Sequence, residues 1–150
     1  GTIVQDQLGQ IGVQVDFQTI DFNVLVELLD QQTFDAVILG WRNSYPFRPD
    51  YSQIFGTVGD EIGGSNSVSY INPELDELFR RGVSVEETNG CDPEVRREIY
   101  AEVTQILNTD APYLWLYSID GQFGWNANIQ GVNPYPNTLY WNITEWTIQP

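Results

Sequence analysis

The sequence predicts an α/β fold in which a mixed sheet is flanked by helices. Helical and strand-like patterns alternate over the first forty residues, and Thr33 to Asp50 has the pattern of a buried strand that leads into an aromatic, proline-bearing loop. Short links between alternating elements favour a sheet covered by helices, with parallel pairing. The length of 150 residues and the 41% of hydrophobic residues suit one globular domain.

The N-terminal pattern predicts a helix, a strand and a second helix. Apolar residues recur at helical spacing over residues 3–11, and Gly12 ends this helix. Residues 13–18 alternate between apolar and polar side chains, as a strand with one buried face does. Asp21 suits the N-cap of a second helix that continues to about Gln32.

The next element predicts where a ligand binds. Residues 35–39 form a nearly continuous apolar run, typical of a strand covered on both faces, and Gly40 ends it. In open α/β sheets, ligands bind beyond the carboxyl ends of strands. We therefore expect a binding surface at Trp41, Arg42, Asn43, Ser44 and Tyr45. The alternative is a structural corner, in which the aromatic residues fasten the loop to its sheet.

The second half of the chain predicts two further helices. Residues 44–70 form a long irregular loop rich in glycine and proline, of a kind that is often functional. Asn72 and Pro73 begin a helix that Gly82 is expected to weaken. Its apolar face is formed by Leu75, Leu78 and Phe79. Asp92 and Pro93 begin a longer one, with its buried stripe at Val95, Ile99, Val103, Ile106 and Leu107.

The C-terminal third is aromatic. Residues 110–112 break the last helix, and residues 113–117 predict an aromatic strand whose Trp115 and Tyr117 we assign to the core. The turns and short strands that follow show no periodicity sufficient to close a core, which indicates packing on another part of a larger protein. The glycosylation sequon at Asn142 is interpreted as a chance match.

Composition excludes several classes of function. The net charge is -15, and the six basic residues are all arginine. Such a surface repels nucleic acid, so no nucleic-acid partner is expected. Without histidine or lysine, the sequence offers no common catalytic triad, no imidazole metal ligand and no phosphate-binding lysine, and Cys91 is alone. We expect no catalytic residue, no metal and no cofactor.

Two features bear on the setting of the chain. No apolar run approaches the ~18 residues that a membrane span needs. The sequence enters a helical pattern at Gly1, Thr2 and Ile3, with no signal peptide before it. This abrupt start indicates a segment of a longer protein, whose targeting sequence would lie upstream.

Several motifs in order resemble those of a known family. They are QDQLGQIGV (5–13), FDAVILGW (34–41), YINPELDEL (70–78), REIYAEVTQI (97–106), DAPYL (110–114) and the late Trp141 and Trp146. Each motif is weak alone, but their order over nearly the whole chain is specific. The chain resembles the C-terminal portion of the family 5 extracellular solute-binding proteins, the dipeptide, oligopeptide and nickel receptors of ABC importers.

The resemblance implies one lobe of a type II periplasmic-binding-protein fold. Two α/β lobes close around a ligand in that family, and periplasmic binding proteins are a known example of hinge closure. Residues 1–130 would form most of the second, C-terminal lobe, and residues 131–150 would return towards a missing first lobe. The implied partners are a small solute, an ABC permease and that first lobe, and the implied location is extracytoplasmic, either periplasmic or anchored at the cell surface.

The resemblance also bears on the ligand. In the peptide receptors, an aspartate in the loop after the Gly-Trp pair holds the amino terminus of the peptide, and Ser44 stands at that position here. A neutral hydroxyl does not replace a carboxylate that faces an ammonium group. Asp50, further along the loop, is the alternative anchor. A peptide is the first expectation, while a sugar, a modified amino acid or another small polar solute stays open.

Two other functions fit parts of the sequence less well. An enzyme with paired carboxylates would use Asp60 with Glu61 or Glu86 with Glu87, but adjacent residues make a poor acid and base pair. A carbohydrate-binding module, or an oligosaccharide-binding receptor of the same family, would stack sugars on Trp41, Tyr45, Trp115 and Trp125. The helices at 72–109 argue against an all-β module. We expect the isolated lobe to fold, to bind its solute weakly and to self-associate through its exposed cleft face.

Overall fold

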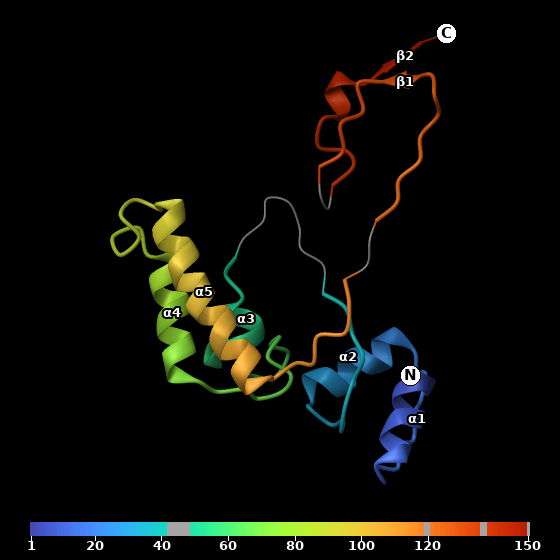
Figure 1. Cartoon of the computed structure of the whole chain (residues 1–150), viewed down its shortest axis with the longest axis vertical. Helices are drawn as coiled ribbons and strands as arrows, with labels where there is room; N and C mark the ends of the chain where they lie inside the picture. Colours follow the sequence, from blue (N-terminus) through green and yellow to red (C-terminus); the bar gives the residue numbers. More distant parts are fainter. Residues whose placement is uncertain (42–48, 119–120, 136–137, 150) are drawn as a thin grey trace.

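The computed structural model describes residues 1–41, 49–118, 121–135 and 138–149 of the chain. They form three parts, of which the C-terminal one lies apart from the other two along the longest axis of the molecule (Figure 1). The first part holds helices α1 (Thr2–Gln10) and α2 (Phe22–Asp30). The second is a helical unit of α3 (Ser52–Phe55), the 3-10 helix η1 (Thr57–Gly59), α4 (Pro73–Val83) and α5 (Pro93–Asp110). The third, C-terminal part holds β1 (Ile129–Gln130), the 3-10 helix η2 (Ile143–Glu145) and β2 (Thr147–Ile148).

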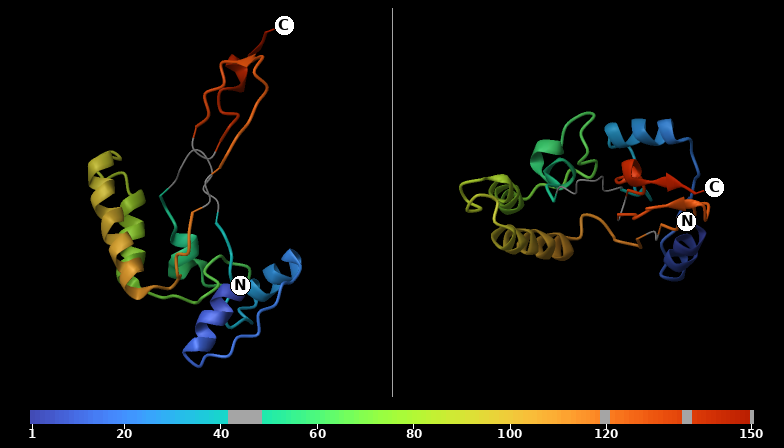
Figure 2. Two further views of the ribbon diagram at one scale, coloured as in Figure 1. Left: turned by 45° about the vertical axis from the view of Figure 1, so that its right-hand side comes forward. Right: turned by 90° about the horizontal axis from the view of Figure 1, so that it is seen from above.

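The three parts bury little surface against one another. Both views of Figure 2 show the C-terminal part well apart from α4 and α5. The accessible surface is 11611 Å², whereas a compact monomer of this size exposes about 7,700 Å². The excess of accessible surface indicates that large areas of this chain would normally be covered by other protein surfaces.

Local capping signals fix the two longest helices. The Asn72 side chain accepts hydrogen bonds from the amides of Glu74 and Leu75, at 3.0 and 3.2 Å. Asp92 caps the next helix in the same way. A proline occupies the first helical position in both cases, where its missing N–H costs nothing. Both predicted helix starts are therefore confirmed.

The hydrophobic core lies between α4 and α5, which run side by side (Figure 1). Its buried members are Phe55, Leu75, Leu78, Phe79, Ile99, Val103 and Leu107. The stripes predicted for both helices supply all of them except Phe55, which comes from α3. No residue of α1 or α2 is buried, and Asn142 is the one buried residue among those described after 120. The core thus belongs to the helical unit alone.

Gly82 has a role other than the predicted one. It is buried inside α4, where α4 meets α5. A Cβ atom at this position would lie 2.8 Å from Cζ of Tyr100. Its carbonyl oxygen also accepts a hydrogen bond from Nε of Arg96, at 3.1 Å. The glycine allows the two helices to approach closely. The reason for a glycine here therefore lies in α5 and not in α4 itself.

The irregular segment before α4 is organised by one buried amide. Asn66 is fully buried and donates from Nδ2 to the carbonyl oxygens of Gly56 and Tyr70, at 3.1 and 2.8 Å. Its Oδ1 accepts from the amide of Tyr70 at 3.1 Å. The short helices α3 and η1 lie in this region, which the sequence predicted to be irregular. Asp76 of α4 holds them by accepting from both the amide and the hydroxyl of Thr57, at 2.8 and 2.6 Å.

The predicted strands are extended segments without a ladder. Residues 13–18, 35–39 and 113–117 carry no strand in the structure, and their apolar side chains are largely exposed. A strand is completed by backbone pairing with a neighbour about 4.8 Å away, and no described segment pairs with these three. The sheet within the described residues has two strands, β1 and β2, paired antiparallel with Ile129 opposite Ile148. The sequence pattern therefore predicted the extended backbone correctly and its pairing wrongly.

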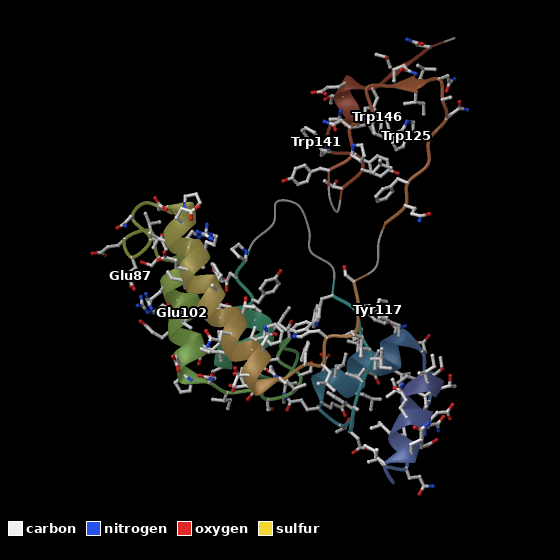
Figure 3. All side chains as sticks on the ribbon, viewed as in Figure 1. Glu87, Glu102, Tyr117, Trp125, Trp141 and Trp146 are labelled. Carbon is white, nitrogen blue, oxygen red and sulfur yellow. The ribbon has the colours of Figure 1, made fainter. Side chains whose placement is uncertain are left out.

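Polar contacts rather than a core hold the C-terminal part. The Asn142 side chain is buried and donates to the carbonyl oxygen of Gly131 at 2.8 Å. Its Oδ1 accepts from the Trp146 indole at 2.9 Å. Figure 3 shows Trp125, Trp141 and Trp146 gathered in this part. A buried amide with these partners is closed to glycosylation, which agrees with interpreting the sequon as a chance match.

Candidate ligand-binding site

An aromatic cluster lies where two extended segments meet the helical unit. It consists of Trp41, Phe55, Tyr113 and Trp115. The segments 33–41 and 111–118 run beside each other next to α2 (Figures 1 and 2). Phe55 of α3 meets them from the helical unit. The cluster therefore joins three stretches of chain that are far apart in the sequence.

Tyr113 stands at the centre of this cluster. Its ring centroid lies 5.0 Å from that of Phe55 in an edge-to-face arrangement, and 5.8 Å from that of Trp115. Phe55 and Trp115 are also edge-to-face, at 5.9 Å. These distances and angles are those that aromatic pairs prefer. Burial raises the pKa of Tyr113, and the nearby Trp41 side chain acts in the opposite direction.

The cluster is anchored on one side and open on the other. Phe55 is 4% exposed and belongs to the core, whereas Trp41 is 48% exposed and Trp115 is 60% exposed. Large aromatic faces that are fixed at one edge and accessible at the other are typical of surfaces that bind apolar or planar groups. The arrangement can hold a ligand by contact and contains no group placed for covalent chemistry.

The structure describes two of the predicted ligand-binding residues. Trp41 lies in the aromatic cluster, and Asp50 lies just before α3. The Asp50 carboxylate accepts from the amide of Ser52, the first residue of α3, at 3.0 Å. Its charge adds to the effect of burial in raising the pKa of Tyr100, which places it near α5. The other predicted positions, Arg42, Asn43, Ser44 and Tyr45, lie outside the described residues.

Comparisons with curated proteins find oligopeptide-binding relatives. The oligopeptide-binding protein AppA of Bacillus subtilis is 30% identical over 146 residues, which make up 96% of this chain and 25% of AppA. The oligopeptide-binding protein OppA of the same organism is 25% identical over 122 residues, or 81% of this chain and 21% of OppA. No protein-family model matches the sequence.

Solved structures extend this similarity to the fold. The structure of AppA in complex with a nonapeptide matches 99% of this chain with a TM-score of 0.73 and 28% identity. The chain is similar to part of these oligopeptide-binding proteins. HbpA2 from Haemophilus parasuis has the same fold over 99% of this chain, with a TM-score of 0.71 and 18% identity. The resemblance found in the sequence is confirmed, as is the α/β fold class of one lobe of such a protein.

The matched region is a small share of each relative. This chain spans about a quarter of the curated relatives' length and 28% of the AppA chain in the solved structure. The similarity covers the extended segments as well as the helices, because it includes 99% of this chain. The solved AppA structure thus matches this chain over the three parts together, with a TM-score of 0.73.

One carboxylate of each pair considered for catalysis is engaged in other contacts. Asp60 accepts from Nε2 of Gln32 at 3.1 Å and from the Ser69 hydroxyl at 2.8 Å, and these bonds hold its pKa below the usual range. Glu87 forms ion pairs with Arg80 at 2.6 Å and Arg81 at 3.7 Å. These contacts tie the segment just after α2 to the segment before α4, and α4 to the segment after it.

Two assignments from the sequence change at this site. Trp115 and Tyr117 were assigned to the core, but they are 60% and 79% exposed. Tyr117 lies beside α2 in Figure 3. Conversely, Tyr113 and Phe55 were not expected at the site. The aromatic run 113–117 was the available signal, but a run alone does not reveal which of its rings faces Trp41.

Two features of the described residues concern metals and membranes. They contain no group of three or more cysteine, histidine or acidic side chains placed to hold a metal ion. No helix among them combines the length and the apolar character needed to cross a bilayer.

Proposed function

We propose that this chain is one lobe of a solute-binding receptor of an ABC importer and that the receptor captures peptides. The main support is the 30% identity to an oligopeptide-binding protein over 96% of this chain. An accessible aromatic cluster at the end of the segment 33–41, where the sequence predicts the ligand, adds to it. The relatives' names favour a peptide over a sugar, which no comparison supports.

The site residues in this proposal are those predicted from the sequence. Trp41 contacts the ligand through its exposed face, and Arg42, Asn43, Ser44, Tyr45 and Asp50 supply the polar contacts. Asp50 is the candidate partner for the amino terminus of a peptide, because Ser44 carries no charge. Since one Asp50 oxygen accepts from Ser52, the ammonium group would bind the remaining lone pairs of the carboxylate.

The proposal extends to the setting of the receptor. Residues 1–130 contribute most of the second lobe, and residues 131–150 lead towards a first lobe. The large accessible surface of this chain supports such an arrangement, because it would be covered there. The partners are an ABC permease and the first lobe, the location is extracytoplasmic, and the protein performs no catalysis. An isolated copy of this chain would self-associate through the same uncovered surface.

Titration calorimetry with peptides of two to nine residues tests this function. The longest natural polypeptide that contains the chain is used, with oligosaccharides and metal chelates as competing ligand classes. We expect peptide binding that Trp41→Ala weakens at least tenfold, which is about 1.4 kcal/mol, and that Asp50→Asn also weakens. Trp125→Ala is the matched control, because Trp125 is 44% exposed and lies in the C-terminal part. Binding of sugars alone, or equal effects of both tryptophan variants, would contradict the proposal.

A further inference from the structure

Gln32 holds the start of the segment 33–41 against a distant part of the chain. Its Nε2 donates to Oδ1 of Asp60 at 3.1 Å and to the carbonyl oxygen of Asn66 at 3.3 Å. The Ser69 hydroxyl donates to Oε1 of Gln32 at 2.6 Å or to Oδ1 of Asp60 at 2.8 Å. The bonds of Gln32 span 28 to 37 positions of the sequence. Gln32, Asp60 and Ser69, here called the clasp, therefore close a long stretch of chain on itself.

The segment that receives Gln32 is itself ordered. Asn66 is fully buried, and its side chain makes three hydrogen bonds to backbone groups of residues 56 and 70. Asp60 and Ser69 lie between those two residues. Gln32 is therefore bonded to a segment of fixed shape, and its bonds set where the segment 33–41 begins relative to the helical unit.

Two of the clasp residues have a backbone conformation that side chains disfavour. The φ angle is 53° at Gln32 and 49° at Ser69, both in the left-handed region. Residues other than glycine keep such a conformation where their surroundings hold them in it, and these conformations cluster at functional sites. The bond of 2.6 Å between the two side chains joins the two positions directly.

The stretch that the clasp closes contains both described residues of the predicted ligand-binding set. Trp41 ends the segment that Gln32 begins, and Asp50 lies just before α3. A chain whose ends are held together has fewer conformations than an open chain. Fewer conformations in the free protein mean that less order has to be created on binding, which raises affinity.

We infer that Gln32 is a positioning residue for peptide binding, which restricts the stretch containing Trp41 and Asp50 by its bonds to Asp60 and Ser69. This inference rests on the proposed function. It adds to that function a residue that acts without touching the ligand. The effect of opening the clasp is a smaller fraction of molecules in the arrangement that binds, and the apparent affinity falls by that fraction.

An exchange of donor and acceptor tests the clasp. Gln32→Glu replaces the donor to Asp60 by a second carboxylate, so that two like charges face each other across a distance of 3.1 Å in the parent. Asp60→Asn in the same chain removes this repulsion, because the new amide at position 60 can donate to the carboxylate at position 32. Gln31→Glu is the matched control, since it adds the same charge one position earlier on an exposed side chain.

Stopped-flow kinetics separate a change in population from a change in the bound complex. The probe is the tightest-binding peptide of the calorimetric series, and the protein is the longest natural polypeptide that contains the chain. We expect Gln32→Glu to lower kon about 3- to 10-fold and to leave koff within about twofold of the parent, because the contacts in the complex are unchanged. Gln32→Glu with Asp60→Asn returns kon to within about twofold of the parent, and Gln31→Glu changes neither rate by more than about twofold.

Several outcomes would overturn the inference. These are an unchanged kon in Gln32→Glu, a kon that stays low when Asp60→Asn is added, and a loss of affinity that arises in koff. Ser69→Ala opens part of the clasp without adding charge, and it serves as the test variant if Gln32→Glu does not fold. It should lower kon about 2- to 3-fold, and an unchanged kon would count against the inference. If the parent binds no peptide of the series, the proposed function itself fails, which is distinct from a parent and a Gln32→Glu variant that bind equally well.

Discussion

Replacing Gly82 by alanine sets two effects of known size against each other. In a helix interior, alanine is more favourable than glycine by about 0.8–1 kcal/mol. The new methyl group would lie 2.8 Å from both Cζ and Oη of Tyr100 and 3.1 Å from Cε2. Forcing extra carbon into a packed site typically costs about 1–3 kcal/mol. We expect the steric cost to exceed the gain and the free energy of unfolding to fall by about 1 kcal/mol.

The chain contains a matched control in Gly9. This glycine lies in α1, and a Cβ atom there would meet nothing within 4 Å. Gly9→Ala therefore receives the helix-propensity gain without the steric cost. We expect it to raise the helical stability of α1 by about 0.5–1 kcal/mol. Urea titrations followed by far-ultraviolet circular dichroism, combined with hydrogen exchange to resolve α1 from α4, measure both variants.

The Tyr100 hydroxyl allows a second check of the same explanation. It is buried without a hydrogen-bond partner among the described residues. Burial raises its pKa, and the nearby Arg96 side chain acts in the opposite direction. Tyr100→Phe removes one of the two closest contacts and a poorly satisfied polar group. It should cost little alone and restore part of the stability lost in Gly82→Ala. Stabilisation by Gly82→Ala to the same extent as Gly9→Ala would refute the reasoning.

Two further predictions concern the same helical unit. Leu75→Ala removes a fully buried side chain and should lower the free energy of unfolding, measured by urea titration, by about 2–5 kcal/mol. Leu114→Ala, at an exposed site, should change this free energy by less than about 0.5 kcal/mol. Equal effects of the two variants would contradict the assigned core. The pKa of Tyr70 is raised to about 12 by burial and by the hydrogen bond to Asp110. The protonated Tyr70 hydroxyl therefore stabilises the folded state fully below the unfolded pKa of about 10, and this stabilisation is lost as the pH rises through 12. Unfolding free energies between pH 9 and 12 should fall less steeply, by about 1 kcal/mol in total, in Tyr70→Phe than in the parent, and parallel slopes would contradict this.

The parts of the fold that the sequence predicted are those with local causes. The starts of α4 and α5 depend on a cap and a proline that adjoin the helix, as at Asn72 and Pro73. Their apolar stripes follow from the helical period. Gly82 could not be interpreted in the same way, because the reason for it is the Tyr100 ring on another helix. The short helices α3 and η1 were missed for a similar reason, since Asp76 of α4 holds Thr57 in place.

The extended segments show the limit of periodicity. The apolar runs at 35–39 and 113–117 indicate that these residues favour burial. Whether they are buried depends on the segments that lie next to them, which the runs do not reveal. Trp41 was found at the candidate site because it follows such a run. Tyr113 was not, because its position is set by Phe55 and by the path of a segment that begins at the left-handed residue Ala111.

The confinement of the core to residues 55–107 divides the chain into regions with different tolerance of substitution. Within the helical unit, the effect of a substitution depends on the volume available between α4 and α5. In α1, α2 and the C-terminal part, the effect depends on how well the side chain packs against a surface outside the chain. Hydrogen exchange should accordingly be slow in α4 and α5 and fast in both flanking parts until that surface is present. Trp41 stands at the border of the two regions. The residue proposed to meet the ligand is therefore also the one through which binding would affect the helical unit, the part of the described chain that has a core of its own.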